Sequence, residues 1–285
     1  MRLTKKAKPK RAQVPRYLDS WGNVKRGYKR TLDLMEFANS GRAPVTTDVE
    51  IAVCFADLRG FTDYVHSLQK ISQDNRVNSF LRDYYEIYPR AILHELWVLE
   101  PDNEKQEVTA EHAELSRLIV PTSYKNLGDG MMIVWELQKC CDARIQGLTT
   151  RIIMQAVEDL QKQFFELTAK LGPVETDSYS KLASNLRLGF GLARGHAWRL
   201  DFGRQIPYDY AGSIVNLAAR LQNLARPSGI VAHLPFSESL LRTFVRTGKG
   251  SIKQIKTIKG LGKELVDVWI SNDVKLPKKY KTDCC

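Results

Sequence analysis

Two aspartates in this sequence lie where an unpartnered carboxylate would be costly. Asp57 follows a run of apolar and small residues, VEIAVCFA (49–56), that predicts a buried strand. Asp129 lies in a Gly-Asp-Gly turn between segments that are mostly apolar. If the hairpin around Asp129 lies beside the first strand, the two carboxylates converge, and carboxylate oxygens are the ligands that Mg²⁺ and Mn²⁺ prefer. Two ions held there could activate an attacking oxygen and stabilise a leaving one in phosphoryl transfer.

Each aspartate alone also has an ordinary structural explanation. Asp129 in Gly-Asp-Gly is what a type I′ hairpin turn favours, and Asp57 can cap the end of a strand. The metal hypothesis therefore depends on the two residues together.

The apolar periodicity predicts the elements that must position these residues. The predicted strands are 49–58, two joined at 128–130 within 117–137, a pair within 186–203, 229–233 and a terminal hairpin at 251–271. The predicted helices are 61–96, 142–171, 212–225 with Ser213 as N-cap, and 236–246. Helices that segregate against a mixed or antiparallel sheet indicate an α+β domain of ferredoxin-like type.

The composition is that of an ordinary globular protein, with 43% hydrophobic and 26% charged residues. The longest apolar runs are far shorter than the roughly 20 residues of a membrane-spanning helix, and no signal-peptide pattern follows the basic N-terminus. The five cysteines lack metal or redox spacing, and Cys54 lies in an apolar run where a small core residue is expected. We therefore expect a cytoplasmic protein without a membrane partner.

The net charge of +11 is concentrated at the N-terminus. Residues 1–30 contain eleven Lys or Arg and one acid, so the rest of the chain is nearly neutral. Such an arm can attract nucleic acid or an anionic surface, but a solvated arm is the simpler interpretation. Apolar residues at three- and four-residue spacing predict a helix over 17–39. We divide the chain into this arm and helix (1–44), a catalytic domain (45–272) and a short basic tail (273–285).

Five segments in a fixed order resemble the motifs of the class III adenylate and guanylate cyclases, and together they span residues 49–270. They are FADLRGFTDY (55–64), YKNLGDGMMIVW (124–135), LRLGFGLARG (186–195), YDYAGSIVNLAARL (208–221) and IKTIKGLGKELVDVW (255–269). The resemblance implies the catalytic-domain fold of that family and its reaction, in which a nucleoside triphosphate becomes a 3′,5′-cyclic monophosphate and pyrophosphate. It also implies two Mn²⁺ or Mg²⁺ ions as cofactors.

The resemblance assigns roles to particular positions. The implied metal ligands are Asp57, Leu58 and Asp129, the implied transition-state residues are Asn216 and Arg220, and the implied triphosphate-binding residues are Arg187 and Lys259. Asn216 and Arg220 are one helical turn apart and therefore share a helix face. An arginine fork can meet two phosphate oxygens, and an asparagine can orient the ribose for in-line attack.

In this family the active site forms between two catalytic domains. One domain gives the metal ligands, and the other gives the Asn, Arg and Lys. This chain contains both sets. The resemblance therefore implies a homodimer with two equivalent shared sites and an inactive monomer.

The base-selecting positions depart from the family pattern. The first position lies six residues before the second metal Asp and is Lys in adenylate cyclases and Glu in guanylate cyclases. The second lies seven residues before the Asn and is Asp or Thr in adenylate cyclases and usually Cys in guanylate cyclases. The matching residues here are Ser123 and Asp209. Without that lysine, adenine loses a charged donor worth about 1.5–3 kcal/mol, unless Lys125 or another residue replaces it. Bulky side chains that could narrow the pocket, each equally explained as core, are Phe55, Tyr124 and Tyr210.

A compact cyclase with an atypical base pocket resembles the stand-alone bacterial pyrimidine (uridylate or cytidylate) cyclases of anti-phage Pycsar systems. That resemblance implies UTP, or else CTP, as substrate and a cyclic nucleotide that activates a separate effector protein in antiviral defence. The alternatives are an adenylate cyclase and, in another class, an inactive cyclase fold that senses nucleotides. A diguanylate cyclase is disfavoured because no Gly-Gly-Asp-Glu-Phe-type turn is present, and the nearly neutral body does not indicate nucleic-acid binding.

Overall fold

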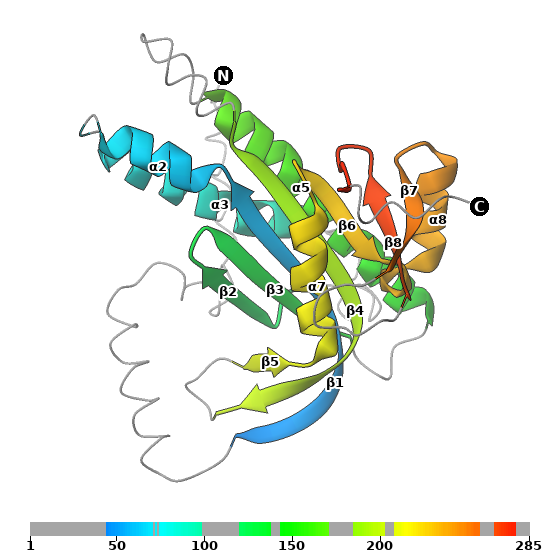
Figure 1. Cartoon of the computed structure of the whole chain (residues 1–285). Coiled ribbons are helices and arrows are strands. Elements are labelled where there is room, and N and C mark those ends of the chain that lie inside the picture. The colour runs from blue at the N-terminus through cyan, green and yellow to red at the C-terminus, as the bar shows by residue number, and fades with distance from the viewer. Residues whose placement is uncertain are drawn as a thin grey trace, which may run out of the picture. The chain divides into compact units, whose positions relative to one another are not determined.

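The computed structural model describes residues 44–70, 72, 74–98, 120–137, 143–170, 185–202, 208–256 and 265–277 (Figure 1). The predicted arm, the helix over 17–39, Lys259 and the end of the tail lie outside these residues. The chain divides into a large unit, Thr46–Leu200 with Tyr208–Cys285, and a small one, Met1–Val45 with Asp201–Pro207. The fold described below is that of the large unit, and the domain boundaries drawn from the sequence stay a prediction.

The described elements alternate between strands and helices along the chain. The strands are β1 (Val45–Arg59), β2 (Ser123–Leu127), β3 (Gly130–Leu137), β4 (Arg187–Asp201), β5 (Asp209–Ala211), β6 (Gly229–His233), β7 (Gly250–Lys256) and β8 (Leu265–Ser271). The helices are α2 (Phe61–Gln69), α3 (Asp74–Val98), α5 (Ala143–Lys170), α7 (Ser213–Leu224) and α8 (Glu238–Arg246), with a 3₁₀ turn, η2 (Leu234–Phe236).

In the described part of the chain the strands form one mixed sheet. Its order is β2-β3-β1-β4-β6-β8-β7, and β5 pairs with β4. β4 and β6 run parallel, whereas the pairs β1–β3, β2–β3, β4–β5, β6–β8 and β7–β8 are antiparallel. A parallel pair needs a crossover connection, which β5 and α7 supply. The predicted α+β class with a mixed sheet is confirmed.

The sheet is covered on both faces, which explains the continuous apolar run of β1. Ala52 and Cys54 pack with α2, α3 and α5, whereas Ile51 and Val53 point to the other face and pack with α7. Figure 1 shows α7 on one side of the strands and α3 and α5 on the other. The predicted core role of Cys54 is confirmed, and burial raises the pKa of its thiol.

Small residues on β4 let α7 lie directly against the sheet. A methyl group added to Gly191 would overlap the carbonyl oxygen of Ala218 and the backbone nitrogen of Gln222, both in α7. The strand and the helix therefore meet backbone to backbone at this point, with no side chain between them.

Two predicted elements are wrong. The segment 186–203, predicted as a strand pair, is the single strand β4. Gly195 makes no turn there; a methyl on it would lie 3.2 Å from Cδ1 of Ile214, so it serves close packing with α7. The helix predicted over 61–96 is two helices, because the chain leaves helical geometry between α2 and α3, where Ser72 has a φ of 56°.

The predicted N-cap of α7 is also wrong by one residue. The helix begins at Ser213, and Gly212 occupies the N-cap position with a φ of 149° and no side-chain capping bond. That backbone conformation favours glycine, which explains why it precedes the helix. The remaining strands and helices predicted over residues that the structure describes are confirmed with shifts of their ends.

None of the described helices combines the length and the hydropathy that crossing a membrane requires. The longest of them, α5, has 28 residues, but charged side chains such as Arg151, Glu158 and Lys162 recur along it.

Candidate active site

The structure brings Asp57 and Asp129 together at one end of β1. Asp57 pairs with Gly130 across β1 and β3, so it lies beside the β2–β3 turn that carries Asp129. The backbone N–H of Leu58 donates to the carbonyl oxygen of Asp129 at 3.3 Å and ties the turn to the strand. Gly128 has a φ of 78°, the left-handed conformation that this tight turn requires. The convergence expected from the sequence is therefore present.

The electrostatics of this pair suit a divalent cation. Burial raises the pKa of Asp129 above its ordinary value, and the neighbouring charge of Asp57 raises it further, while a backbone hydrogen bond and Arg59 act in the opposite direction. A bound cation would remove the repulsion between the two carboxylates. The described residues contain no group of three or more His, Cys, Asp or Glu that could hold a metal. Two carboxylates are nevertheless enough for a magnesium site, in which one or two protein carboxylates bind the ion together with substrate phosphates.

Leu58 can contribute only its backbone to such a site. Its side chain is buried, and its N–H is already bonded to the turn. Its predicted role as a metal ligand through the carbonyl oxygen stays a prediction.

Asn216 and Arg220 lie on the exposed face of α7. Both are exposed, whereas Ile214, Leu217 and Leu221 on the opposite face are buried in the sheet. Among the described residues, no hydrogen bond or ion pair links Asn216 or Arg220 to either aspartate. The helix thus displays the predicted transition-state pair toward solvent, one turn apart.

Of the two predicted triphosphate-binding residues, the structure describes Arg187 but not Lys259. Arg187 is the first residue of β4 and is exposed, with Nη1 donating to the carbonyl oxygen of Leu186 at 2.8 Å. By strand alternation it lies on the α7 face, like Gly189 and Gly191 after it. Lys259 lies outside the described residues, so its role stays a prediction.

The predicted base-recognition residues gather between β2 and β5. Ser123 Oγ donates to the carbonyl oxygen of Tyr208 at 3.3 Å, and two residues along the same strand Lys125 Nζ lies 2.8 Å from Asp209 Oδ2. Both side chains of this ion pair are partly exposed. The structure therefore places the positive charge of Lys125 next to Asp209, two residues along the strand from Ser123.

Of the three bulky candidates, Phe55 and Tyr210 lie on the sheet face that carries Lys125, and Tyr124 lies on the other. Met132 of β3 pairs with Phe55 of β1 on one side and with Lys125 of β2 on the other. Because cross-strand partners share a face of the sheet, Phe55 and Lys125 lie on the same face. Tyr124 points to the opposite face, where its ring meets that of Tyr88 at 6.2 Å in the core. Tyr210 is buried and bonded to other strands. Tyr124 and Tyr210 are therefore core residues, and Phe55 remains the candidate for narrowing the pocket.

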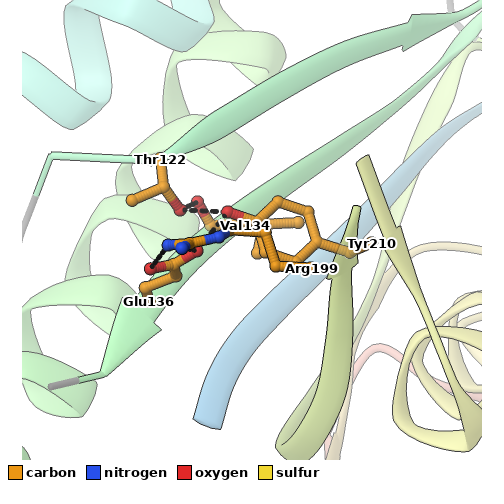
Figure 2. Close-up of polar contacts among 5 residues, drawn as sticks. All are labelled: Thr122, Val134, Glu136, Arg199 and Tyr210. Atoms are coloured by element: carbon orange, nitrogen blue, oxygen red, sulfur yellow. Dashed lines mark hydrogen bonds and ion pairs between the residues drawn. The ribbon is translucent and has the colours of Figure 1, made fainter. Parts of the chain in front are cut away.

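A polar cluster fixes β5, and with it Asp209, against β3. Figure 2 shows the cluster. The hydroxyl of Tyr210 donates to Glu136 Oε1 at 2.8 Å and lies 3.2 Å from Thr122 Oγ1. Arg199 Nη1 lies 3.0 Å and 3.2 Å from the two carboxylate oxygens of Glu136, and its guanidinium lies 4.7 Å from the centre of the Tyr208 ring. The residues on both sides of Asp209 are thus held in place.

The sequence matches no family model, and no curated protein matches it. The structure is similar to that of the adenylyl cyclase CyaB from P. aeruginosa, with a TM-score of 0.50, 17% identity, and 81% of this chain and 100% of that chain covered. For the guanylyl cyclase Cya2 the TM-score is 0.52 and the identity 16%, and the match covers 84% of this chain and 98% of that chain. For a bacterial light-regulated adenylyl cyclase the TM-score is 0.51 and the identity 17%, and the match covers 91% of this chain and 61% of that chain. The chain has a cyclase catalytic-domain fold.

Within this cyclase fold, two tyrosines of α3 support the turn that carries Asp129. The hydroxyl of Tyr84 donates to the carbonyl oxygen of Asp129 at 3.2 Å, and that of Tyr85 donates to the carbonyl oxygen of Gly128. The hydroxyl of Tyr84 also lies 2.6 Å from that of Tyr88. Sequence reasoning did not assign these residues to the site. The only signal was a pair of adjacent tyrosines in an apolar helix, which predicts core packing equally well.

Sequence reasoning also missed Arg59. Its Nη1 lies 2.7 Å from Asp57 Oδ2, and its side chain is 13% exposed. Residues two apart on a strand share a face, so the position of Arg59 beside Asp57 could have been inferred from the sequence. Its second partner, the carbonyl oxygen of Gln222 at 2.8 Å, is 163 residues away in the chain and could not have been inferred from the sequence.

Proposed function

We propose that this chain is a metal-dependent nucleotide cyclase, which converts a nucleoside triphosphate into the 3′,5′-cyclic monophosphate and pyrophosphate. The observation that carries the proposal is the convergence of Asp57 and Asp129 beside one another in a cyclase catalytic-domain fold. An inactive nucleotide sensor would have no need of a second carboxylate beside Asp57, because burial and the charge of Asp57 both disfavour the ionised form of Asp129.

The residues present would hold two divalent cations through the carboxylates of Asp57 and Asp129, with Leu58 contributing its carbonyl oxygen. Bound Mn²⁺ or Mg²⁺ supplies positive charge that favours ionisation of the 3′-hydroxyl and stabilises the departing pyrophosphate. Asn216 would orient the ribose, and Arg220 would donate to the phosphate oxygens as their charge grows. Arg187 and Lys259 would bind the β- and γ-phosphates.

The proposed enzyme is a homodimer with two shared sites. The metal ligands and the pair on α7 make no direct contact within the described part of one chain, so a second chain would complete each site. An exposed aromatic residue supports a protein contact on β4, since Trp198 is 53% exposed.

For the base we propose UTP, or else CTP, as the substrate. Lys125 and Asp209 together offer one donor and one acceptor, and uracil presents an acceptor (O4) beside a donor (N3–H). Phe55 on the same sheet face would limit the space to a single ring. The second candidate is ATP. It is favoured by the Lys125–Asp209 pair itself, because adenine also presents an acceptor and a donor side by side.

The product would act as a second messenger that activates a separate effector protein in antiviral defence. This role rests on the resemblance to pyrimidine cyclases, and we propose the cytoplasm as its location.

The direct test is to incubate the purified full chain with ATP, GTP, CTP and UTP, each with Mn²⁺, and to identify the products by mass spectrometry. We expect a cyclic pyrimidine monophosphate and pyrophosphate. Cyclic AMP as the sole product would contradict the pyrimidine proposal, and no cyclic product from any nucleotide would favour the sensor.

Replacing either member of the ion pair should weaken base selection. In Lys125→Ala and Asp209→Ala we expect kcat/KM for the preferred nucleotide to fall about 10- to 100-fold, since a charged hydrogen bond contributes about 1.5–3 kcal/mol. The ratio of kcat/KM between preferred and rejected nucleotides should fall with it. Lys249→Ala is the matched control, because Lys249 is an exposed lysine paired with Glu158. An unchanged ratio in both variants would exclude this pair from base recognition.

A further inference from the structure

Arg59 connects the proposed metal site to α7. One guanidinium nitrogen, Nη1, lies 2.7 Å from Asp57 Oδ2, and the other, Nη2, donates to the carbonyl oxygen of Gln222 at 2.8 Å. Gln222 is two residues beyond Arg220, in the last turn of α7. The carbonyl oxygen of Gln222 also accepts the backbone N–H of Ala225 at 3.1 Å, and a cation near the C-terminal end of a helix is favourable.

Gly189 lies beside this guanidinium and directly against the end of α7. A methyl group on Gly189 of β4 would lie 3.5 Å from Arg59 Nη2 and 2.6 Å from the carbonyl oxygen of Ala225. A side chain at this position would therefore clash with the end of α7 and would also touch Arg59. The contact is thus enclosed by β1, β4 and α7.

The two oxygens of Asp57 have different surroundings. Oδ2 is bound by Arg59, whereas a methyl group on Gly130 would lie 3.6 Å from Oδ1, which places Oδ1 on the side of the Asp129 turn. Arg59 therefore fixes the carboxylate by one oxygen and leaves the oxygen near Asp129 available.

We propose that Arg59 is a positioning residue that holds Asp57 in the orientation needed to bind a divalent cation together with Asp129. It does so by joining Asp57 to the fixed carbonyl of Gln222. This inference rests on the proposed cyclase function, because it concerns the metal ligands of that same site. It adds a residue with no part in the motif roles assigned from the sequence.

The charge and the geometry of Arg59 predict opposite results. Arg59 is a cation beside a cation site, so on charge alone its removal should tighten metal binding. If its main role is to orient Asp57, its removal should weaken metal binding, as the loss of groups that orient metal ligands does. The sign of the change in metal affinity separates the two.

The experiment measures Mn²⁺ binding to the purified full chain without nucleotide, by the electron paramagnetic resonance signal of free Mn²⁺. For Arg59→Gln we expect the Kd for Mn²⁺ to rise about 10-fold or more. For Arg59→Lys we also expect a rise, because one ammonium group cannot bridge Asp57 and Gln222 as the guanidinium does. Arg242→Gln, which removes an exposed arginine paired with Glu238 on α8, should leave the Kd unchanged.

Thermal unfolding in the presence of a chelator identifies which variants are folded. A folded Arg59→Gln or Arg59→Lys chain that binds Mn²⁺ as tightly as the wild type, or more tightly, would overturn the inference. If Arg59→Gln does not fold, Arg59→Lys decides the question. Asp57→Ala separates this result from the proposed function, since an unchanged Kd in that variant would mean that Mn²⁺ does not bind at the aspartate pair at all.

Discussion

An Asp57→Ala chain and an Asn216→Ala chain, each nearly inactive alone, should recover about a quarter of the wild-type rate when they are mixed and allowed to exchange subunits. Each variant alone should retain about 1% of the wild-type activity or less, because one lacks a proposed metal ligand and the other the group that orients the ribose. The measurement is the rate of cyclic nucleotide formation at equal total chain concentration.

The expected quarter follows from counting sites. Random pairing makes half of the dimers mixed, and each mixed dimer has one site with both residues intact and one with neither. Asn223→Ala is the control, because Asn223 is exposed on the same helix and its side chain donates to the carbonyl oxygen of Ala219 within that helix. Its mixture with Asp57→Ala should behave like wild type mixed with Asp57→Ala. If the Asp57→Ala and Asn216→Ala mixture stays inactive although dimers exchange, the sites are not shared between chains.

Arg220→Lys should lower kcat about 100- to 1000-fold while KM changes little, because a charge-stabilising group that acts mainly in the transition state contributes about 2.7–4 kcal/mol there. Lysine keeps the charge but loses the planar fork that can meet two phosphate oxygens. Steady-state kinetics with the nucleotide found by the product assay separate kcat from KM.

Arg242→Lys is the matched control for this substitution, since Arg242 is an exposed helical arginine on α8. It should leave both constants unchanged. A rise in KM with kcat preserved in Arg220→Lys would instead assign Arg220 to substrate binding.

The sequence was sufficient to predict the convergence of Asp57 and Asp129 because that convergence depends on local features. A buried apolar strand and a Gly-Asp-Gly hairpin each have a strong local pattern, and pairing β1 with β3 brings the two aspartates together. The exposed pair on α7 was predictable for the same reason, since Asn216 and Arg220 share a face of an amphipathic helix.

The sequence could not predict contacts between distant segments. The bonds from Tyr84 and Tyr85 to the β2–β3 turn and the bond from Arg59 to Gln222 depend on how helices pack on the sheet. Nothing in the adjacent residues distinguishes such side chains from ordinary core or surface ones. The salt bridge between Lys125 and Asp209 could not be predicted either, because β5 must first pair with β4 to bring Asp209 near β2.

Glycines account for two of the errors in the predicted secondary structure, and the third is the break between α2 and α3 at Ser72. Gly195 lies in the segment predicted as two strands, but its role is to let Ile214 pack closely on the single strand β4. Gly212 was overlooked as the residue before α7, where its φ of 149° is favourable only for glycine. In both cases a glycine is needed for tertiary packing or a special backbone conformation, and periodicity does not report either.

The direct contact between Gly191 and α7 gives the two faces of the sheet different mechanical character. On the face of α3 and α5, interlocking side chains separate helix and strand, so their spacing can adjust when a core residue changes size. At Gly191 the spacing under α7 is set by main-chain atoms that cannot be repacked, while side chains fill the rest of that layer. A change in the size of a core residue between the sheet and α3 or α5 is therefore expected to displace Asn216 and Arg220 less than it displaces those two helices.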